Sequence, residues 1–501
     1  MRHLSKSKLV SFRQCPKRLW LDIHKPELRD NSAYQHVFGI GNRVGEIAME
    51  IYDTTGDAYE ISISELGFNE VFQKSAELLD AGDRPIFEAG VKVAGGLAFA
   101  DVMIPSRTSG ELCWKMVEVK SATKSKDYHR DDAALLHYLF EQAGAKLHSV
   151  SIAHIDNSFV YAGDGNYQGL LRENDITEEV RSRVAEMNQW IADAQATIKL
   201  TDEPEIGCGT QCHSPFTCPF LAHCSREDGK AEHPLSLLPN FHGKKANLLA
   251  ERGVVELADV PKDLLSEIQQ RVQQCTLSGE TYFDSEATVE ELSQYGFPAY
   301  FLDFETSNSA VPMWKGTRPY QQLPFQFSVH VLDEDGTFTQ ESFLDLSGND
   351  PRLGFTESLL QNCGDSGPIF VYNIAFERKI INQQAAHFPQ HAKQLGAIAD
   401  RLVDLLPIAR AHYYHPSQCG KWGIKSVLPA ISPDLDYSEL DGVKDGNMAM
   451  VAFQEAIHPD TSEERKTEIY NQLDKYCQLD TLAMVRIWEV FTGKQTSATI
   501  S

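Results

Sequence analysis

The sequence predicts an α/β protein with more than one domain, and three observations lead to this expectation. A chain of 501 residues is long enough for two or three domains. Two separate groups of short apolar strands, within 86–138 and 301–377, are each followed by a helical pattern. The hydrophobic content of 42% and the charged content of 23% are those of a globular protein.

The first group of strands brings two acids and a lysine together. Glu118 and Lys120 are two residues apart and share one strand face, and Asp101 would meet them from the hairpin partner. Two carboxylates can bind a metal ion, and a lysine beside them can orient or activate water. A lone E-x-K on a strand is, however, far more often a surface ion pair. The expected strands cover 86–89, 97–102 and 114–120, with a turn at 105–110.

This pattern, D-(x)₁₆-E-V-K followed by a helix at 131–138, resembles the PD-(D/E)xK nucleases of the RecB type. The resemblance covers roughly 4–228 and implies a restriction-endonuclease-like domain at 1–230. In such a domain Asp101 and Glu118 would bind Mg²⁺ or Mn²⁺, and Lys120 would be catalytic.

Two positions depart from the family pattern. His137 stands in the helix where such nucleases often carry glutamine. After the early G-x-x-V, the chain has Glu46 near the position of a metal-binding histidine. Glu46 is therefore a further candidate metal ligand.

Four of the ten cysteines, Cys208, Cys212, Cys218 and Cys224, fall within seventeen residues. A cytosolic cluster of this density indicates a metal centre rather than disulfides. Its spacing leaves zinc and iron–sulfur open, since only the first two cysteines could form a short zinc knuckle.

Iron–sulfur members of the RecB-type family join one cysteine near the N-terminus to three after the nuclease core. By this resemblance, a 4Fe–4S cluster would be held by Cys15, Cys212, Cys218 and Cys224, with Cys208 as the spare. It would tie the first helix of the domain to the last.

The second group of strands begins with Phe301-Leu302-Asp303-Phe304-Glu305. Asp303 and Glu305 project from the same face, which is costly to bury unless a cation such as Mg²⁺ is present. A second strand at 368–373 is followed by a helical pattern containing Glu377, and a late helix places Tyr476 and Asp480 one turn apart. A hairpin is expected from 325–332 and 337–344.

The order D-x-E, an acid after a YN strand–helix junction, and Y-x-x-x-D on a late helix resembles the DEDDy 3′–5′ exonucleases. The resemblance covers roughly 300–490 and implies an RNase H-like domain at 296–501. The metal ligands implied are Asp303, Glu305, Glu377 and Asp480, and Tyr476 is implied to be catalytic. Glu377 stands where the family usually has aspartate.

Between the two domains, 231–295 is expected to be a helical linker, with Asn240–Ala246 and Leu248–Val254 similar to a helix-hairpin-helix. The loop 420–426 supplies lysine and tryptophan for substrate contact, although core packing is the commoner fate of Trp422. No apolar run is long enough to span a bilayer and no secretory signal is evident, so we expect a cytoplasmic protein that does not enter membranes.

The net charge of −25 argues against generic electrostatic binding of nucleic acid, although the first thirty residues hold eight Lys and Arg against three Asp and Glu. The expected function is a metal-dependent nuclease acting on nucleic acid, foremost a 3′–5′ exonuclease on single-stranded DNA. The alternatives are RNA as substrate, one active half only, or a non-catalytic nucleic-acid-binding scaffold with protein partners in a defence or repair complex.

Overall fold

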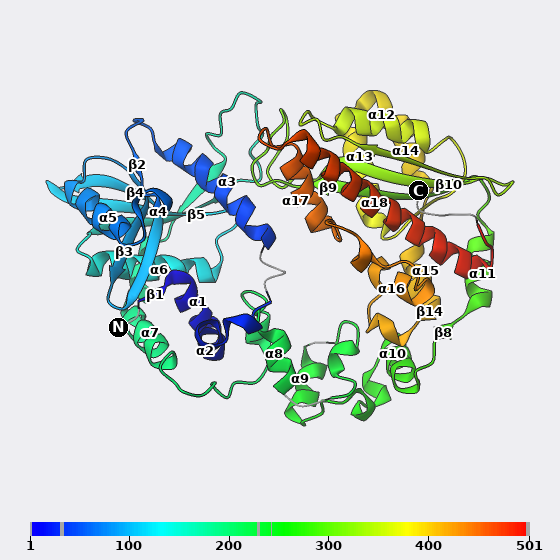
Figure 1. Ribbon diagram of the computed structural model, residues 1–501, viewed down its shortest axis with the longest axis horizontal. Helices are drawn as coiled ribbons and strands as arrows, with labels where there is room; N and C mark the ends of the chain where they lie inside the picture. The colour runs from blue at the N-terminus through cyan, green and yellow to red at the C-terminus, as the bar shows by residue number, and fades with distance from the viewer. Residues whose placement is uncertain (1–2, 31–34, 228–230, 242, 497–501) are drawn as a thin grey trace. The chain divides into compact units, whose positions relative to one another are not determined.

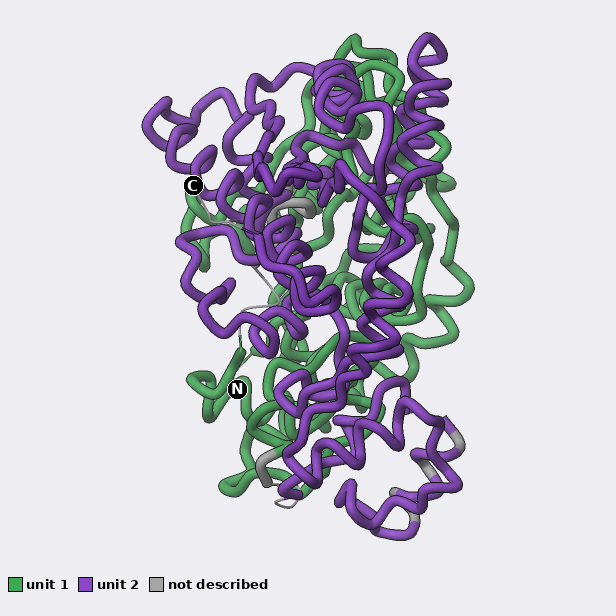
Figure 2. Tube along the Cα trace, turned by 90° about the vertical axis from the view of Figure 1, so that its right-hand side faces the viewer, with its two compact units in different colours: residues 1–230, 309–320 green, residues 231–308, 321–501 purple. Residues whose placement is uncertain are grey.

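The structure is a computed structural model with the mixed α/β architecture expected from the sequence (Figure 1). The chain forms two compact units, coloured separately in Figure 2. Unit 1 comprises 1–230 and 309–320, and unit 2 comprises 231–308 and 321–501. The residues that the structure describes are 3–30, 35–227, 231–241 and 243–496. His242, in the segment compared with a helix-hairpin-helix, lies outside them.

A mixed sheet in the order β2-β3-β4-β5-β6-β7 forms the centre of unit 1, and β1 pairs with β4. β3, β4 and β5 are antiparallel, and helix α6 (Asp127–Gln142) then returns the chain so that β6 pairs parallel to β5. The strands are β1 (Leu4–Ser5), β2 (Tyr59–Glu60), β3 (Ile86–Val93), β4 (Gly96–Thr108), β5 (Glu111–Lys120), β6 (Leu147–Ile155) and β7 (Leu171–Asp175).

The turn between β4 and β5 is shorter than the expected turn at 105–110. Thr108 pairs with Glu111, so only Ser109 and Gly110 form the turn, and both have positive φ. Residues 105–108 instead continue β4, because they keep their ladder partners on β5. β4 and β5 are therefore paired from the turn to Val102 and Val117, which are the neighbours of Asp101 and Glu118.

Helices pack on this sheet through a large apolar core. Leu135, Leu139 and Phe140 of α6 lie in that core with Trp190 and Ile191 of α7. The helices of unit 1 are α1 (Lys6–Gln14), α2 (Pro16–His24), α3 (Gln35–Tyr52), α4 (Ile63–Leu66), α5 (Glu70–Ala81), α6 (Asp127–Gln142), α7 (Thr177–Thr197) and α8 (Leu221–Glu227).

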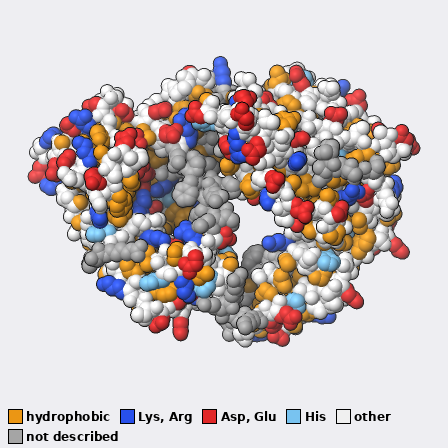
Figure 3. Space-filling model, in the orientation of Figure 1, with side chains coloured by type: hydrophobic (Ala, Val, Ile, Leu, Met, Phe, Trp, Pro, Cys, Tyr) orange, Lys and Arg blue, Asp and Glu red, His pale blue; other side chains and the backbone are white. Residues whose placement is uncertain are grey.

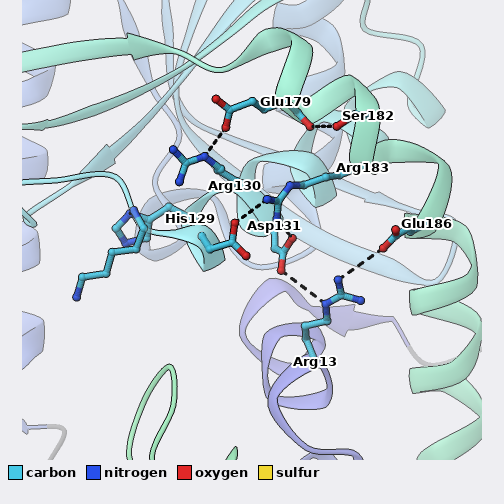
Figure 4. A network of polar contacts seen from close by, with 10 residues as sticks. Arg13, His129, Arg130, Asp131, Glu179, Ser182, Arg183 and Glu186 are labelled. Atoms are coloured by element: carbon cyan, nitrogen blue, oxygen red, sulfur yellow. Dashed lines mark hydrogen bonds and ion pairs between the residues drawn. The ribbon is translucent and has the colours of Figure 1, made fainter.

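A polar network fastens α1 to α6 and α7 (Figure 4). Asp131 of α6 accepts a hydrogen bond of 2.5 Å from Arg183 of α7. Arg13 of α1 lies 3.6 Å from the same carboxylate and 3.5 Å from Glu186 of α7. The network therefore holds the C-terminal end of α1, which is followed by Cys15, against α6. This helix also runs beside the first candidate site.

The sheet of unit 2 has the order β11-β10-β9-β12-β13. β9, β10 and β11 are antiparallel, and β12 and β13 continue the sheet in parallel beside β9. The expected hairpin is present as β10 and β11. The strands are β9 (Ala299–Ser307), β10 (Leu323–Leu332), β11 (Phe338–Leu344), β12 (Ile369–Val371) and β13 (Leu402–Asp404), with a separate pair β8 (Tyr282–Phe283) and β14 (Tyr413–Tyr414).

Alternate residues of β9 face two different helical layers. Leu302 and Phe304 pack with side chains of α12, α13 and α14, whereas Phe301 packs with side chains of α18. The helices of unit 2 are α9 (Lys244–Glu251), α10 (Glu267–Ser278), α11 (Ser285–Ser293), α12 (Arg352–Asn362), α13 (Ile374–His387), α14 (Ala392–Asp400), α15 (Leu405–His412), α16 (Ile424–Ile431), α17 (Gly446–Ala456) and α18 (Glu463–Thr492).

Residues 231–295 belong to unit 2 and contribute to its core. Leu257, Val272 and Leu292 are buried in one cluster with Trp488 and Phe491 of α18. Trp422 is buried in the same cluster, with its indole N–H donating to the carbonyl of Tyr413 at 2.8 Å. This segment and the tryptophan therefore help to hold α18 in place.

Candidate active sites

Three carboxylates meet where β9 passes α18. Oxygens of Asp303, Glu305 and Asp480 all lie within 4.8 Å of one another. The two strand acids point to the α18 side because Leu302 and Phe304 occupy the opposite face. Glu305 is 8% exposed and Asp480 is 5% exposed, so the group is largely withdrawn from water. Such closely packed carboxylate oxygens suit a hard divalent cation.

Hydrogen bonds between β10 and α18 set the position of Asp480. The hydroxyl of its neighbour Thr481 lies 2.9 Å from the Ser328 hydroxyl and 2.8 Å from Nδ1 of His330. One helical turn earlier than Tyr476, the carbonyl of Leu473 accepts a 2.8 Å bond from the side chain of Gln326. These buried contacts fix both the rotation and the height of α18 over the sheet.

Glu377 lies close to this group but outside the closest trio. It sits in the first turn of α13, is 2% exposed, and its charge acts on Asp303. Its Oε2 atom is buried, and no residue in the described part of the chain gives it a hydrogen bond. A buried carboxylate oxygen without a partner is costly, and a bound cation would satisfy it.

Two tyrosines and a lysine complete the surroundings of the trio. The hydroxyl of Tyr437 donates a 2.5 Å hydrogen bond to Asp480. The ammonium of Lys425 donates to the hydroxyl of Tyr476 at 3.1 Å and to the carbonyl of Lys444 at 2.7 Å. Tyr437 was not identified from the sequence, and Lys425 was included only as part of the loop 420–426. The sequence of that loop does not predict that Lys425 lies beside the acids, because no local spacing relates Lys425 to β9 or α18.

The carboxyl groups of this site hold their protons strongly when no cation is bound. Burial, followed by the charge of Asp480, raises the pKa of Glu305 to about 8. Burial also raises the pKa of Glu377 to about 8, and burial with neighbouring acids raises the pKa of Asp303 well above its usual range. The charge of Lys425 lowers the pKa of Asp303, Glu305 and Asp480 but does not cancel these effects.

These shifts predict a metal-linked pH dependence of stability. Because Glu305 and Glu377 have a higher pKa in the folded state than the free value of about 4.3, the folded protein binds more protons. Without metal, its free energy of unfolding should therefore fall as the pH rises from about 4.3 to about 8. Thermal unfolding in EDTA or Mg²⁺ checks this: the increase in Tm caused by Mg²⁺ should be larger at pH 8 than at pH 5.5. An equal increase at both pH values would contradict it.

The first candidate site lies at the ends of β4 and β5. The strand pairing ends at Val102 and Val117, and just beyond it the amide of Asp101 donates to Oε1 of Glu118 at 3.4 Å, so the two acids lie side by side. Oδ2 of Asp101 accepts a 2.6 Å bond from the amide of Val119, and Oε2 of Glu118 accepts a 2.9 Å bond from the Lys120 ammonium. A cavity of about 450 Å³ is lined by Asp101 and Lys120 and by Glu46 of α3. Glu46 also pairs with Arg43 at 2.7 Å.

Two lysines compete for Glu118. Besides Lys120, Lys6 of α1 donates to the same Oε2 atom at 3.1 Å. Burial alone would raise the pKa of Glu118, but these two ammonium groups hold it at about 2. Burial, followed by the charge of Glu118, raises the pKa of Asp101 to about 6. A cation entering this site would therefore have to share Glu118 with a lysine.

Three further charged groups near this site were not identified from the sequence. They are Lys6, Asp132, whose carboxylate lies 3.8 Å from the Lys120 ammonium, and Glu88, which lines the cavity. Asp132 follows Asp131 on the expected helix. With the first turn of that helix known, its periodicity would have shown that Asp132 faces the site. His137, which stands where the family often has glutamine, does not line the cavity. Its ring is buried, and Nδ1 lies 3.6 Å from the carboxylate of Glu141.

The cysteines predicted to bind a cofactor gather at the junction of α1, α2 and α8. Cys15 is the residue between α1 and α2, and Cys212, Cys218 and Cys224 are buried together with Trp20 and Phe220. The spare, Cys208, is exposed. The side chain of Gln14 donates to the carbonyls of Gln211 and Phe216, both at 2.6 Å, and so holds the cysteine loop against α1.

Thiolates of cysteine are ligands that both zinc and an iron–sulfur cluster accept. Tetrahedral zinc with Zn–S bonds of 2.3 Å requires sulfur atoms about 3.8 Å apart. Among the described residues, no three cysteine sulfurs lie within 4.8 Å of one another. Burial, as the main cause, raises the pKa of Cys224 to about 11, so the thiols would have to lose protons on binding a metal centre. Cys212, Cys218 and Cys224 are buried and Cys15 is partly exposed, so three of the four candidate ligands are withdrawn from water.

The molecular surface carries both signs of charge. On the face shown in Figure 3, Lys and Arg side chains are interspersed with Asp and Glu side chains. None of the helices in the described part of the chain combines the length and apolarity needed to cross a bilayer.

Comparisons with known proteins add one match. A family model described as a domain of unknown function (DUF2779) matches residues 300–423. This span includes Asp303, Glu305 and Glu377 but ends before Tyr476 and Asp480. None of the curated proteins compared with the chain matches it.

Proposed function

We propose that the protein is a metal-dependent nuclease whose unit 2 is a 3′–5′ exonuclease acting on single-stranded DNA. The observation that carries this proposal is the close trio of Asp303, Glu305 and Asp480, of which the last two are buried, with Tyr476 on the same helix as Asp480. The order of antiparallel strands β9 to β11, followed by parallel β12 and β13, supports an RNase H-like fold for this unit.

In this proposal the carboxylates hold two divalent cations, Mg²⁺ or Mn²⁺. When bound, such ions supply charge stabilisation for the attacking and leaving oxygens of a phosphodiester. Asp303, Glu305 and Asp480 form the closer ligand set, and Glu377 has the unsatisfied Oε2 atom that a ligand would use. The additional methylene of Glu377, compared with the aspartate of the DEDDy family, gives its carboxylate the reach to contribute from α13.

Tyr476 can orient the attacking water. A tyrosine hydroxyl has one donor and two acceptor positions. Its donor is used on Asp480, and one acceptor is used by Lys425. The second acceptor position can take a hydrogen bond from the water. Burial strongly raises the pKa of Tyr476, so the phenol stays protonated and acts by orientation rather than as a base.

Lys425 can bind the scissile phosphate. An ammonium group has three donors, and the contacts found within the described residues use two of them, on Tyr476 and on the carbonyl of Lys444. The third donor would complement a phosphate oxygen beside the metal ligands. Lys425 would thus contact both Tyr476, which orients the water, and the scissile phosphate.

Replacing Tyr476 with phenylalanine should lower kcat for 3′-end digestion on the order of 10²-fold, because one orienting hydrogen bond is lost. The ring remains, so folding should be retained. Tyr413→Phe is the matched control, since the hydrogen bond found for its hydroxyl among the described residues goes to the carbonyl of Ala430 at 3.3 Å, away from the acids. Equal kcat values for the two variants in steady-state digestion would remove Tyr476 from the mechanism.

For unit 1 we propose a second metal-dependent nuclease site of the RecB type. The run of α5, three antiparallel strands, α6 and parallel β6 supports the restriction-endonuclease-like fold. Asp101 and Glu118 would bind the metal, with Glu46 at the cavity wall, and Lys120 would stabilise charge on the phosphate. The ion pairs of Glu118 with Lys6 and Lys120 favour a competing proposal, in which this unit binds nucleic acid without cutting it.

We also propose that Cys15, Cys212, Cys218 and Cys224 hold a 4Fe–4S cluster. When bound, the cluster would cross-link α1, α2 and α8, and no redox step in hydrolysis requires it.

Cys212→Ser should remove the brown colour and the iron of anaerobically purified protein and lower the Tm of unit 1, because a cluster ligand is lost. Cys113→Ser should keep both, since Cys113 is buried in β5 near Thr108 rather than in the cysteine loop. The iron and zinc contents per chain, measured after anaerobic purification, distinguish a 4Fe–4S cluster from a zinc site. Stoichiometric zinc without iron after anaerobic purification would refute the cluster.

The overall proposal is tested by digesting labelled single- and double-stranded DNA and RNA with Mg²⁺ or Mn²⁺. We expect metal-dependent hydrolysis with single-stranded DNA as the best substrate. Protein that binds oligonucleotides without cutting any of them under these conditions would support the scaffold alternative instead.

A further inference from the structure

A short segment from the C-terminal half of the sequence is part of unit 1. Residues 309–320 belong to unit 1, whereas the residues before and after them belong to unit 2. The amide of Tyr320 donates to the carbonyl of Ser309 at 2.9 Å, which closes the segment into a loop. The segment begins two residues after the end of β9, the strand that carries Asp303 and Glu305.

The loop is built into unit 1 by backbone hydrogen bonds and burial. The amide of Tyr161 donates to the carbonyl of Thr317 at 3.0 Å, and the amide of Gly316 donates back to Tyr161 at 2.8 Å. The hydroxyl of Tyr167 donates to the carbonyl of Pro312 at 3.1 Å. Thr317 is completely buried, so the loop is a packed element of the unit.

The same loop contacts two walls of the Lys120 cavity. The hydroxyl of Tyr320 donates a hydrogen bond to the carbonyl of Ser121, the residue after Lys120. Val311 is buried against Val44 of α3, which also lines the cavity. Val119, between Glu118 and Lys120, packs against this cluster as well.

We infer that 309–320 is a positioning element of the first nuclease site and that Tyr320 is its principal positioning residue. β5 ends at Lys120, and the hydroxyl of Tyr320 holds the next carbonyl, that of Ser121. This contact keeps the Lys120 ammonium between Glu118 and Asp132. The inference rests on the activity proposed for unit 1, and it makes that site dependent on a segment encoded far downstream.

The test compares Tyr320→Phe with Tyr167→Phe in full-length protein carrying Asp303→Asn. Each change removes one hydroxyl contact between the loop and the rest of unit 1, but only Tyr320 holds the end of β5. We expect Tyr320→Phe to lower kcat for Lys120-dependent cleavage roughly tenfold with KM within about twofold, as for a misplaced catalytic group. Tyr167→Phe should leave both constants nearly unchanged.

Hydrogen exchange separates this inference from the activity on which it rests. In Tyr320→Phe, amides 119–123 should exchange at least about fivefold faster than in Tyr167→Phe, since one hydrogen bond contributes about 1 kcal/mol. Equal exchange in the two variants would overturn the positioning role, whether or not the site cuts. Faster exchange in a protein without Lys120-dependent cleavage would support positioning and refute the nuclease activity of unit 1.

Discussion

Asp303→Asn should nearly abolish the release of nucleotides from 3′ ends, with a fall in kcat on the order of 10³-fold or more. Asparagine preserves shape but removes the charge of a carboxylate that lies within 4.8 Å of Glu305 and Asp480. Since the burial of Asp303 among other acids disfavours its charged form, the variant should also have a higher Tm in EDTA than the parent. Digestion assays and thermal unfolding measure the two effects.

The control for Asp303→Asn is Asp284→Asn. Asp284 is also in unit 2, but its carboxylate caps α11 by accepting the amide of Ala287 at 3.1 Å. Asparagine can replace it in that role, so kcat should be unchanged. If Asp303→Asn digests 3′ ends as fast as Asp284→Asn while the first site is disabled, the trio is not the exonuclease centre.

Lys120→Met should lower cleavage by unit 1 between about 10²- and 10⁴-fold, because it removes the cation at the cavity while keeping much of the side-chain volume. The effect must be measured in an Asp303→Asn background, so that unit 2 does not mask it. Loss of this ammonium also leaves Lys6 as the sole lysine at Glu118 among the described contacts.

Lys115→Met is the matched control on the same strand. Lys115 pairs with Glu173 of β7 at 2.7 Å and does not line the Lys120 cavity. It should lower stability slightly and leave cleavage unchanged. Equal cleavage rates for Lys120→Met and Lys115→Met would favour the view that unit 1 binds nucleic acid without cutting it.

Local periodicity was enough to anticipate much of the fold and part of each site. The two-residue spacing of Asp303 and Glu305 determines their common face, and the hairpin of β4 and β5 brings Asp101 next to Glu118. Asp480 and Tyr476 share a helix face for the same kind of reason. These relations depend on backbone geometry within a few residues or across one turn.

Other parts of the sites depend on tertiary packing that short-range patterns do not encode. Lys425 and Tyr437 reach the trio from segments that show no spacing relation to β9 or α18. Lys6 reaches Glu118 across 112 positions of sequence. The place of 309–320 in unit 1 likewise results from contacts with Tyr161 and Tyr167 rather than from any local signal.

The most direct test of the central claim is the direction of digestion by the Lys120→Met protein, in which only unit 2 should be active. With Mg²⁺ and a 5′-labelled single-stranded DNA, we predict a ladder that shortens from the 3′ end, release of mononucleotides, and no digestion when the 3′ terminus is blocked. Internal cuts, or shortening that persists at the same rate after adding Asp303→Asn, would contradict the assignment of a 3′–5′ exonuclease to Asp303, Glu305 and Asp480.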